Sequence, residues 1–228
     1  LRALRILREV SIIAAEDTRV TRGLLSHYDI HTRMISHHNA NEKLVTKKIL
    51  DILESEDVAI VSDAGTPLIN DPGFIIVKAA IEAGIRVVPI PGPSSPITAL
   101  SVSGLPVDEF TYLGYLPHKQ GDRLSMLRNK SELGSTLIIF STPHRVLDDL
   151  QDILTVLGNR SIAVCRELTK LHEEIFRGNV QNALEHIQEH PPLGEFVLII
   201  EGNATSTDWD DEQIDNAISS GLADNIKS

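Results

Sequence analysis

"VSDAGTPLINDPG", residues 61–73, is the stretch that decides the fold class of this chain. It follows the apolar run at 58–61 and precedes a helical pattern at 73–83. A simple connection from a strand to a helix needs about 2–6 residues and one N-cap. This connection is longer, and Gly65 allows a close backbone approach while Pro67 stiffens the turn. We therefore expect a ligand-holding loop, and we interpret Asp71-Pro72 as the N-cap and first turn of the next helix.

Apolar runs alternate with helical patterns on both sides of this loop. The predicted strands of the first half lie at 11–15, 33–36, 58–62 and 86–90, and the predicted helices at 18–27, 41–55, 73–83 and 93–102. The opening at 1–10 has leucines at helical spacing and resembles a helix already under way, so we expect a segment before Leu1. Strand–helix alternation with unpatterned apolar strands is typical of a mostly parallel sheet covered by helices.

The second half follows a different pattern. Its predicted strands lie at 110–116, 136–140, 161–166, 174–178 and 195–201, and its helices at 121–133, 143–157 and 180–190. Two successive strands without a helix between them indicate antiparallel pairing, and hence a mixed sheet. We therefore predict an α/β protein with an N-terminal α/β domain at 1–105, whose first strand is missing, a C-terminal α/β domain at 106–202, and a truncated acidic extension at 203–228.

Composition argues against a membrane-spanning protein and shows where positive charge is concentrated. The chain has 228 residues, 42% of them hydrophobic, and no uncharged apolar run long enough for a membrane span. Its single cysteine, Cys165, fits a buried strand thiol and a cytoplasmic location. The net charge is −11, but residues 1–48 carry nine Lys/Arg against five Asp/Glu, and Lys119, Arg123, Arg128 and Lys130 form a second basic patch. Local positive surface on an acidic body could attract a polyanion at chosen places, although ordinary solvated helix faces are the favoured explanation of the charge alone.

Several familiar catalytic motifs are absent from the sequence. There is no GxxxxGK[ST], GxGxxG, HExxH, CxxC or GxSxG pattern, and the adjacent His37 and His38 would point apart on a strand. We expect no metal site. Four loops that follow predicted strands remain, at 15–19, 36–42, 62–73 and 90–95. Open α/β sheets bind ligands at the carboxyl ends of their strands, so we expect these loops to open on one edge.

The residues of these loops match a known family. The segments SDAGTPLINDPG and VVPIPGPSSPITALSVSGLP resemble the tetrapyrrole-methylase superfamily of S-adenosylmethionine-dependent methyltransferases. The segments AAEDTR, SHHNANEK, GYLP, TPHR, RELTKLHEE, FRG and GEFVLIIEG look like its branch that methylates the ribose 2′-OH of a cytidine in bacterial small-subunit (16S) ribosomal RNA. The resemblance runs from about Leu1 to Gly202. It implies two α/β domains with the cofactor in the cleft between them, a homodimer, a partner in the small ribosomal subunit, and no membrane or DNA partner.

The resemblance also assigns residues. Cofactor contacts would come from Asp63, Ala64, Gly65, Thr66, Pro67, Ile69, Ser94, Ser95, Leu168, Thr169, Phe196 and Val197. RNA contacts would come from Arg19, Arg22, His38, Asn39 and Arg123, because guanidinium groups bind phosphates well. A ribose hydroxyl reacts poorly until it loses its proton, so a general base would help. The candidates are Glu16, Asp17, His37 and Glu42, and the sequence does not choose among them; Asp17 could instead cap a helix.

One departure from the family pattern leaves two alternatives open. Members of the family usually begin with a strand and a Pro-Ile-Gly-Asn loop, which this sequence lacks. A methylase of the same fold acting on a corrin or porphyrin precursor would also use a basic patch. A non-catalytic RNA-binding or ribosome-assembly module would need no cofactor at all. Titration with S-adenosylmethionine and a comparison of substrates would separate these hypotheses.

Overall fold

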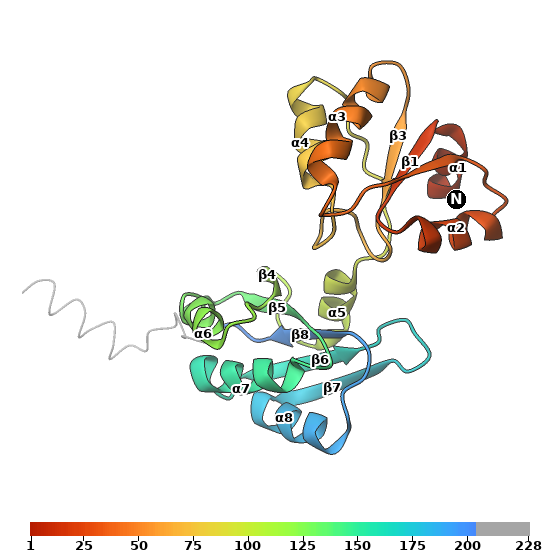
Figure 1. Cartoon of the computed structure of the whole chain (residues 1–228). Helices are drawn as coiled ribbons and strands as arrows, with labels where there is room; N and C mark the ends of the chain where they lie inside the picture. Colours follow the sequence, from red (N-terminus) through yellow and green to blue (C-terminus); the bar gives the residue numbers. More distant parts are fainter. Residues whose placement is uncertain (204–228) are drawn as a thin grey trace, which may run out of the picture. The chain divides into compact units, whose positions relative to one another are not determined.

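A computed structural model describes residues 1–203 of the chain, which form two compact units, Leu1–Thr98 and the part from Ala99 onward (Figure 1). The acidic extension expected after residue 202 lies almost wholly outside the described residues. The helix α5 (Ser95–Ser103) leads from the first unit into the second. No helix among the described residues has the length and apolar character needed to cross a membrane.

The first unit is built on a three-stranded parallel sheet. Its strands are β1 (Ile12–Ala15), β2 (Arg33–Ser36) and β3 (Val58–Val61), in the order β2-β1-β3. Its helices are α1 (Arg2–Glu9), α2 (Thr18–His27), α3 (Glu42–Leu53) and α4 (Phe74–Glu82). All four residues of β1 are buried, which explains the unpatterned apolar sequence of this central strand.

Helices cover both faces of this sheet. Ile13 packs in one cluster with Leu7 of α1 and Leu25 of α2. Its neighbour Ala14 points to the opposite face, where it packs with Ile49 of α3 and Ile76 of α4. The covered parallel sheet predicted for the first half is therefore confirmed, and the carboxyl ends of its three strands meet at one edge.

The second unit is built on a five-stranded mixed sheet. Its strands are β4 (Phe110–Tyr115), β5 (Thr136–Ser141), β6 (Ser161–Arg166), β7 (Glu174–Asn179) and β8 (Phe196–Ile200), in the order β4-β5-β8-β6-β7. Only β4 and β5 pair in parallel; the other pairs are antiparallel. The helices α6 (Gln120–Arg128), α7 (Val146–Leu157) and α8 (Val180–Glu189) line one face, and Ala99 and Leu100 of α5 pack on the other (Figure 1). The predicted mixed sheet is confirmed.

One local prediction is wrong and another is confirmed. The strand predicted at 86–90 is absent: the backbone there joins no ladder, and Val87 and Val88 stay exposed. Pro89 cannot donate to a neighbouring strand, and apolar residues alone do not make a strand without a paired backbone. Cys165, by contrast, is a buried thiol in β6 as expected, and burial raises its pKa to about 11.

Candidate functional site

Three loops meet at the carboxyl edge of the parallel sheet, and hydrogen bonds join them. The backbone N–H of Asp17, after β1, donates to Asp63 Oδ1 at 2.9 Å. In return the N–H of Asp63, after β3, donates to Glu16 Oε2 at 3.3 Å. The N–H of His37, after β2, donates to the carbonyl of Ala15 at 2.8 Å. The expectation that the loops share one edge is therefore confirmed for the three that follow strands, and the Glu16 and Asp63 carboxylates are each oriented by a backbone amide of the neighbouring loop.

The loop at 62–73 is a set of fixed turns. The N–H of Ile69 donates to the carbonyl of Thr66 at 3.2 Å, and Leu68 has a φ of 74°. Proline second and a positive φ third is the pattern of a type II turn. The Thr66 hydroxyl donates to the carbonyl of Pro93 at 2.8 Å, which ties the fourth loop to this one although no strand precedes it.

Four carboxylates gather at this edge: Glu16, Asp17, Asp63 and Asp71. Burial raises the pKa of Asp71, and the negative charges of Glu16 and Asp63 add to that effect. The interpretation of Asp71 as an N-cap is wrong, because α4 begins at Phe74 with Gly73 at the capping position. Asp71 instead belongs to the acidic edge, where the charges of Glu16 and Asp63 act on it. The Asp-Pro pattern usually marks the start of a helix, so the sequence did not predict that Asp71 belongs to this edge.

Asp17 and Arg19 form a tight local pair. Asp17 caps α2 by accepting from the N–H of Arg19 at 2.8 Å, as the alternative sequence interpretation anticipated. The Arg19 guanidinium also bonds the same carboxylate, with Nη2 at 2.6 Å from Oδ2. These hydrogen bonds from Arg19 lower the pKa of Asp17 to about 2. A carboxylate that holds its charge so strongly is a poor proton acceptor at neutral pH.

Glu42 and His37 lie deeper in the unit. Glu42 Oε1 accepts from the N–H groups of Gly73 at 2.9 Å and Ile75 at 3.1 Å, so it holds the start of α4. His37 is 1% exposed, and burial lowers its pKa. Its Nε2 lies 3.9 Å from Glu42 Oε1, beyond hydrogen-bond distance. Glu42 therefore has a structural role at the start of α4, and the His37 side chain is shielded from solvent.

The first unit leaves most of the expected cofactor residues accessible. Asp63, Ala64, Gly65, Thr66 and Ser95 are exposed, Ile69 is 45% exposed, and Pro67 and Ser94 are half-buried. Gly65 has a φ of 69°, and a Cβ added there would meet no atom within 4 Å. The edge therefore combines open backbone, an exposed apolar side chain and several negative charges. Carboxylates accept hydrogen bonds and attract positive charge, so these groups fit a positively charged ligand.

The other four expected cofactor residues lie in the second unit, two of them in a loop and two in a buried strand. Leu168 is half-buried and Thr169 is exposed, both in the loop between β6 and β7. Phe196 and Val197 are buried in β8 on opposite faces of the sheet, Phe196 among the side chains under α7 and α8, and Val197 on the α5 face. Their side chains cannot both face the same ligand.

The expected RNA residues divide in the same way. Arg19, Arg22 and Asn39 are exposed, and His38 is half-buried. Arg123 is only 5% exposed: its Nε donates to Asp152 Oδ2 at 2.6 Å and its Nη1 to the carbonyls of Pro117 and His118. This placement argues against the RNA contact expected for Arg123, because its guanidinium is already bound within the protein.

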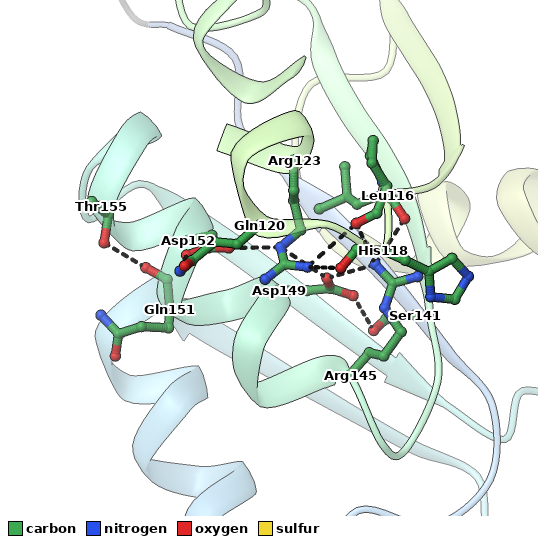
Figure 2. A network of polar contacts seen from close by, with 11 residues as sticks. Leu116, His118, Gln120, Arg123, Ser141, Arg145, Asp149, Gln151, Asp152 and Thr155 are labelled. Carbon is green, nitrogen blue, oxygen red and sulfur yellow. Dashed lines mark hydrogen bonds and ion pairs between the residues drawn. The ribbon is translucent and has the colours of Figure 1, made fainter. Parts of the chain in front are cut away.

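Arg123 is part of a buried polar network, shown in Figure 2. Arg145 donates to the carbonyl of Leu116 at 2.7 Å and to Asp149 at 3.3 Å, while the Ser141 hydroxyl donates to Asp149 at 2.6 Å. Burial raises the pKa of Asp149, against the opposing effect of Ser141 and the two arginines. The network fixes the loop after β4 to the helices α6 and α7. The sequence does not reveal this network, because its members are far apart in the chain.

Comparisons with known proteins agree with one another. The family described as Tetrapyrrole (Corrin/Porphyrin) Methylases matches residues 1–184. Proteins named ribosomal RNA small subunit methyltransferase I are similar over 89% of this chain. The Escherichia coli O157:H7 protein is 48% identical, with 72% of its length covered; the Halalkalibacterium halodurans protein is 46% identical, with 70% covered; and the Thermotoga maritima protein is 42% identical, with 91% covered.

A solved structure supports the fold independently. The crystal structure of the methyltransferase CobJ matches with a TM-score of 0.62, covering 89% of this chain and 87% of that one. Sequence identity is 17%, so this likeness concerns the fold alone. Within the described residues, no group of three or more His, Cys, Asp or Glu side chains is arranged to hold a metal ion.

Proposed function

The chain belongs to the tetrapyrrole methylase family, and we propose that it transfers a methyl group from S-adenosylmethionine to the ribose 2′-oxygen of a cytidine in small-subunit ribosomal RNA. Its similarity to the small-subunit rRNA methyltransferases supports the substrate class. An rRNA substrate also supports a cytoplasmic location. The homodimer implied by the sequence resemblance stays a prediction.

The acidic edge of the parallel sheet is the observation that carries the cofactor assignment. S-adenosylmethionine, when bound, supplies an activated methyl group on a positively charged sulfur. Asp63 presents an exposed carboxylate beside Glu16, and Gly65 leaves the backbone open to a ligand. Carboxylates accept hydrogen bonds from hydroxyl and amino groups and attract a cation. Ile69 adds an exposed apolar side chain in the same loop. The cofactor contacts that the sequence resemblance assigns to Leu168 and Thr169 stay a prediction.

The geometry favours Glu16 as the general base. Arg19 keeps Asp17 ionised, Glu42 accepts a hydrogen bond from the backbone at the start of α4, and His37 is buried. Glu16 is half-buried at the same edge and is oriented by the N–H of Asp63. It would accept the proton of the ribose hydroxyl, while Arg19 and Arg22 hold phosphates and the loops align the reacting groups.

Methyl transfer to purified small ribosomal subunits tests the function. We expect labelled methyl groups to appear in the rRNA and, after digestion to nucleosides, in 2′-O-methylcytidine. Label in a panel of corrin and porphyrin precursors, with none in rRNA, would favour the tetrapyrrole alternative. Binding of RNA without binding of S-adenosylmethionine would favour a non-catalytic module.

Glu16→Gln tests the proposed base. We expect the rate of methyl transfer to fall by about 10²–10⁴-fold, because a positioned base contributes that much to a proton transfer. The affinity for S-adenosylmethionine should stay close to that of the unmodified chain. The matched control is Glu9→Gln on α1, which should leave the rate unchanged. Full activity of Glu16→Gln would remove Glu16 from this role.

A further inference from the structure

The loop between β6 and β7 contains a backbone conformation that its sequence disfavours. Thr169 has a φ of 66°, and Glu167, two residues earlier, has a φ of 49°. The N–H of Lys170 donates to the carbonyl of Glu167 at 3.0 Å, so Thr169 is the third residue of a closed turn. Glycine or asparagine usually occupies such a position, and a β-branched residue there is an outlier. Because Thr169 is exposed, packing of its side chain does not explain it.

The Glu167 carboxylate holds this turn in place. Its Oε1 accepts from the N–H of Glu195 at 2.9 Å and from Lys170 Nζ at 2.8 Å. Lys170 Nζ also reaches Glu195 Oε2 at 3.0 Å. These contacts join the loop after β6 to the segment that enters β8. The side chain of Glu167 is only 19% exposed, so it is an integral part of the second unit.

Gly194 makes room for that carboxylate. A Cβ added at Gly194 would lie 2.3 Å from Glu167 Cγ and 2.5 Å from Glu167 Oε1, far inside normal contact distance. The φ of Gly194 is 81°, which also favours glycine. We call Glu167, Lys170, Gly194 and Glu195 the Glu167 clasp. The clasp explains why the segments RELTK and GEF, which stand out in the sequence, belong together in the structure.

We propose that Glu167 is a positioning residue that keeps the Leu168–Thr169 turn in its cofactor-binding form. The inference rests on the proposed function and on the assignment of these two residues to cofactor binding. Without the clasp, Thr169 relaxes out of the left-handed region, because that region is costly for residues other than glycine. The fraction of molecules ready to bind then falls, and the apparent Kd rises by the same factor.

Strain of this kind need not signal a ligand, and Asp29 provides the contrast. Its φ is 53°, but it directly follows α2, where the N–H of Ile30 donates to the carbonyl of Leu25 at 2.9 Å. That arrangement is an ordinary helix ending. Thr169 terminates no helix, since β6 and β7 flank its loop. Its conformation is therefore held by two sets of contacts: the clasp, and Glu173, whose Oε2 accepts from the Thr169 N–H.

Calorimetric titration of the full chain with S-adenosylmethionine tests the proposal. We expect Glu167→Ala to weaken binding about tenfold, or about 1.4 kcal/mol. Glu167→Gln keeps an acceptor for the Glu195 N–H, so its affinity for S-adenosylmethionine should fall by less than that of Glu167→Ala. The decisive variant is Glu167→Ala combined with Thr169→Gly, because glycine adopts the turn without strain and should restore affinity to within about twofold. Glu185→Ala on α8, an exposed acid of the same unit, is the control.

Each outcome decides between roles. Unchanged binding by Glu167→Ala, or no recovery on adding Thr169→Gly, would overturn the positioning role and leave Glu167 a purely structural residue. No heat with the unmodified chain would overturn the proposed function and, with it, the cofactor role of the clasp. Hydrogen exchange at the Lys170 amide separates these failures: it should be slow in the unmodified chain and fast in Glu167→Ala, whether or not the cofactor binds.

Discussion

The carboxyl ends of parallel strands are used in opposite ways in the two units. In the first unit, Glu16 and Asp63 are accessible carboxylates that are oriented by backbone N–H groups of neighbouring loops. In the second unit, the ends of β4 and β5 are closed by the buried arginines and aspartates of Figure 2. The first arrangement leaves carboxylates available to a ligand. In the second, the arginines and aspartates are buried and bind one another. The comparison therefore distinguishes charged residues that can bind a ligand from charged residues that stabilise the fold.

Asp152→Ala is the strongest way to break this comparison. It leaves the Arg123 charge buried without its 2.6 Å partner, so we expect a loss of about 3–5 kcal/mol in the free energy of unfolding. Urea unfolding measures the change. Glu9→Ala, which breaks the exposed Arg5–Glu9 pair, should cost less than about 1 kcal/mol. Equal losses in the two variants would show that the network does not fix the second unit.

Glu42→Ala should have a smaller effect on the first unit. It leaves the N–H groups of Gly73 and Ile75 without their acceptor, which should cost about 1–3 kcal/mol. Glu42→Gln keeps an oxygen acceptor and should cost less, and Glu82→Ala on the surface of α4 is the control. If Gln proved as harmful as Ala in urea unfolding, the charge of Glu42 rather than its hydrogen bonds would be the important property.

The smallest effect concerns the titration of Asp17. Arg19 lowers its pKa from the ordinary 3.8 to about 2, so the capping interaction is complete above pH 3.8 and is lost as the pH falls through about 2. In Arg19→Ala we expect the pKa of Asp17 to move up toward its ordinary value. NMR titration of the carboxyl carbon measures it. A midpoint that stays near 2 would show that the helix terminus, not Arg19, sets the value.

The sequence predicted what depends on local pattern. The helix α2 has the predicted bounds, since Asp17 supplies its cap and apolar residues recur at helical spacing. The strand at 86–90 failed because a strand needs a paired backbone, which periodicity cannot reveal. Arg123 looked like surface because its partner Asp152 lies 29 residues away. Asp71 looked like a cap, and its place beside Glu16 follows only from the folded loop.

Titration of Asp63→Ala with S-adenosylmethionine tests the central claim, that the acidic edge of the first unit is the cofactor site. Asp63 is exposed and its Oδ1 accepts from the N–H of Asp17, so we expect at least about tenfold weaker binding than the unmodified chain. Asp51→Ala, an exposed acid on α3, should bind normally. Undiminished affinity in Asp63→Ala would contradict the assignment and place the cofactor elsewhere.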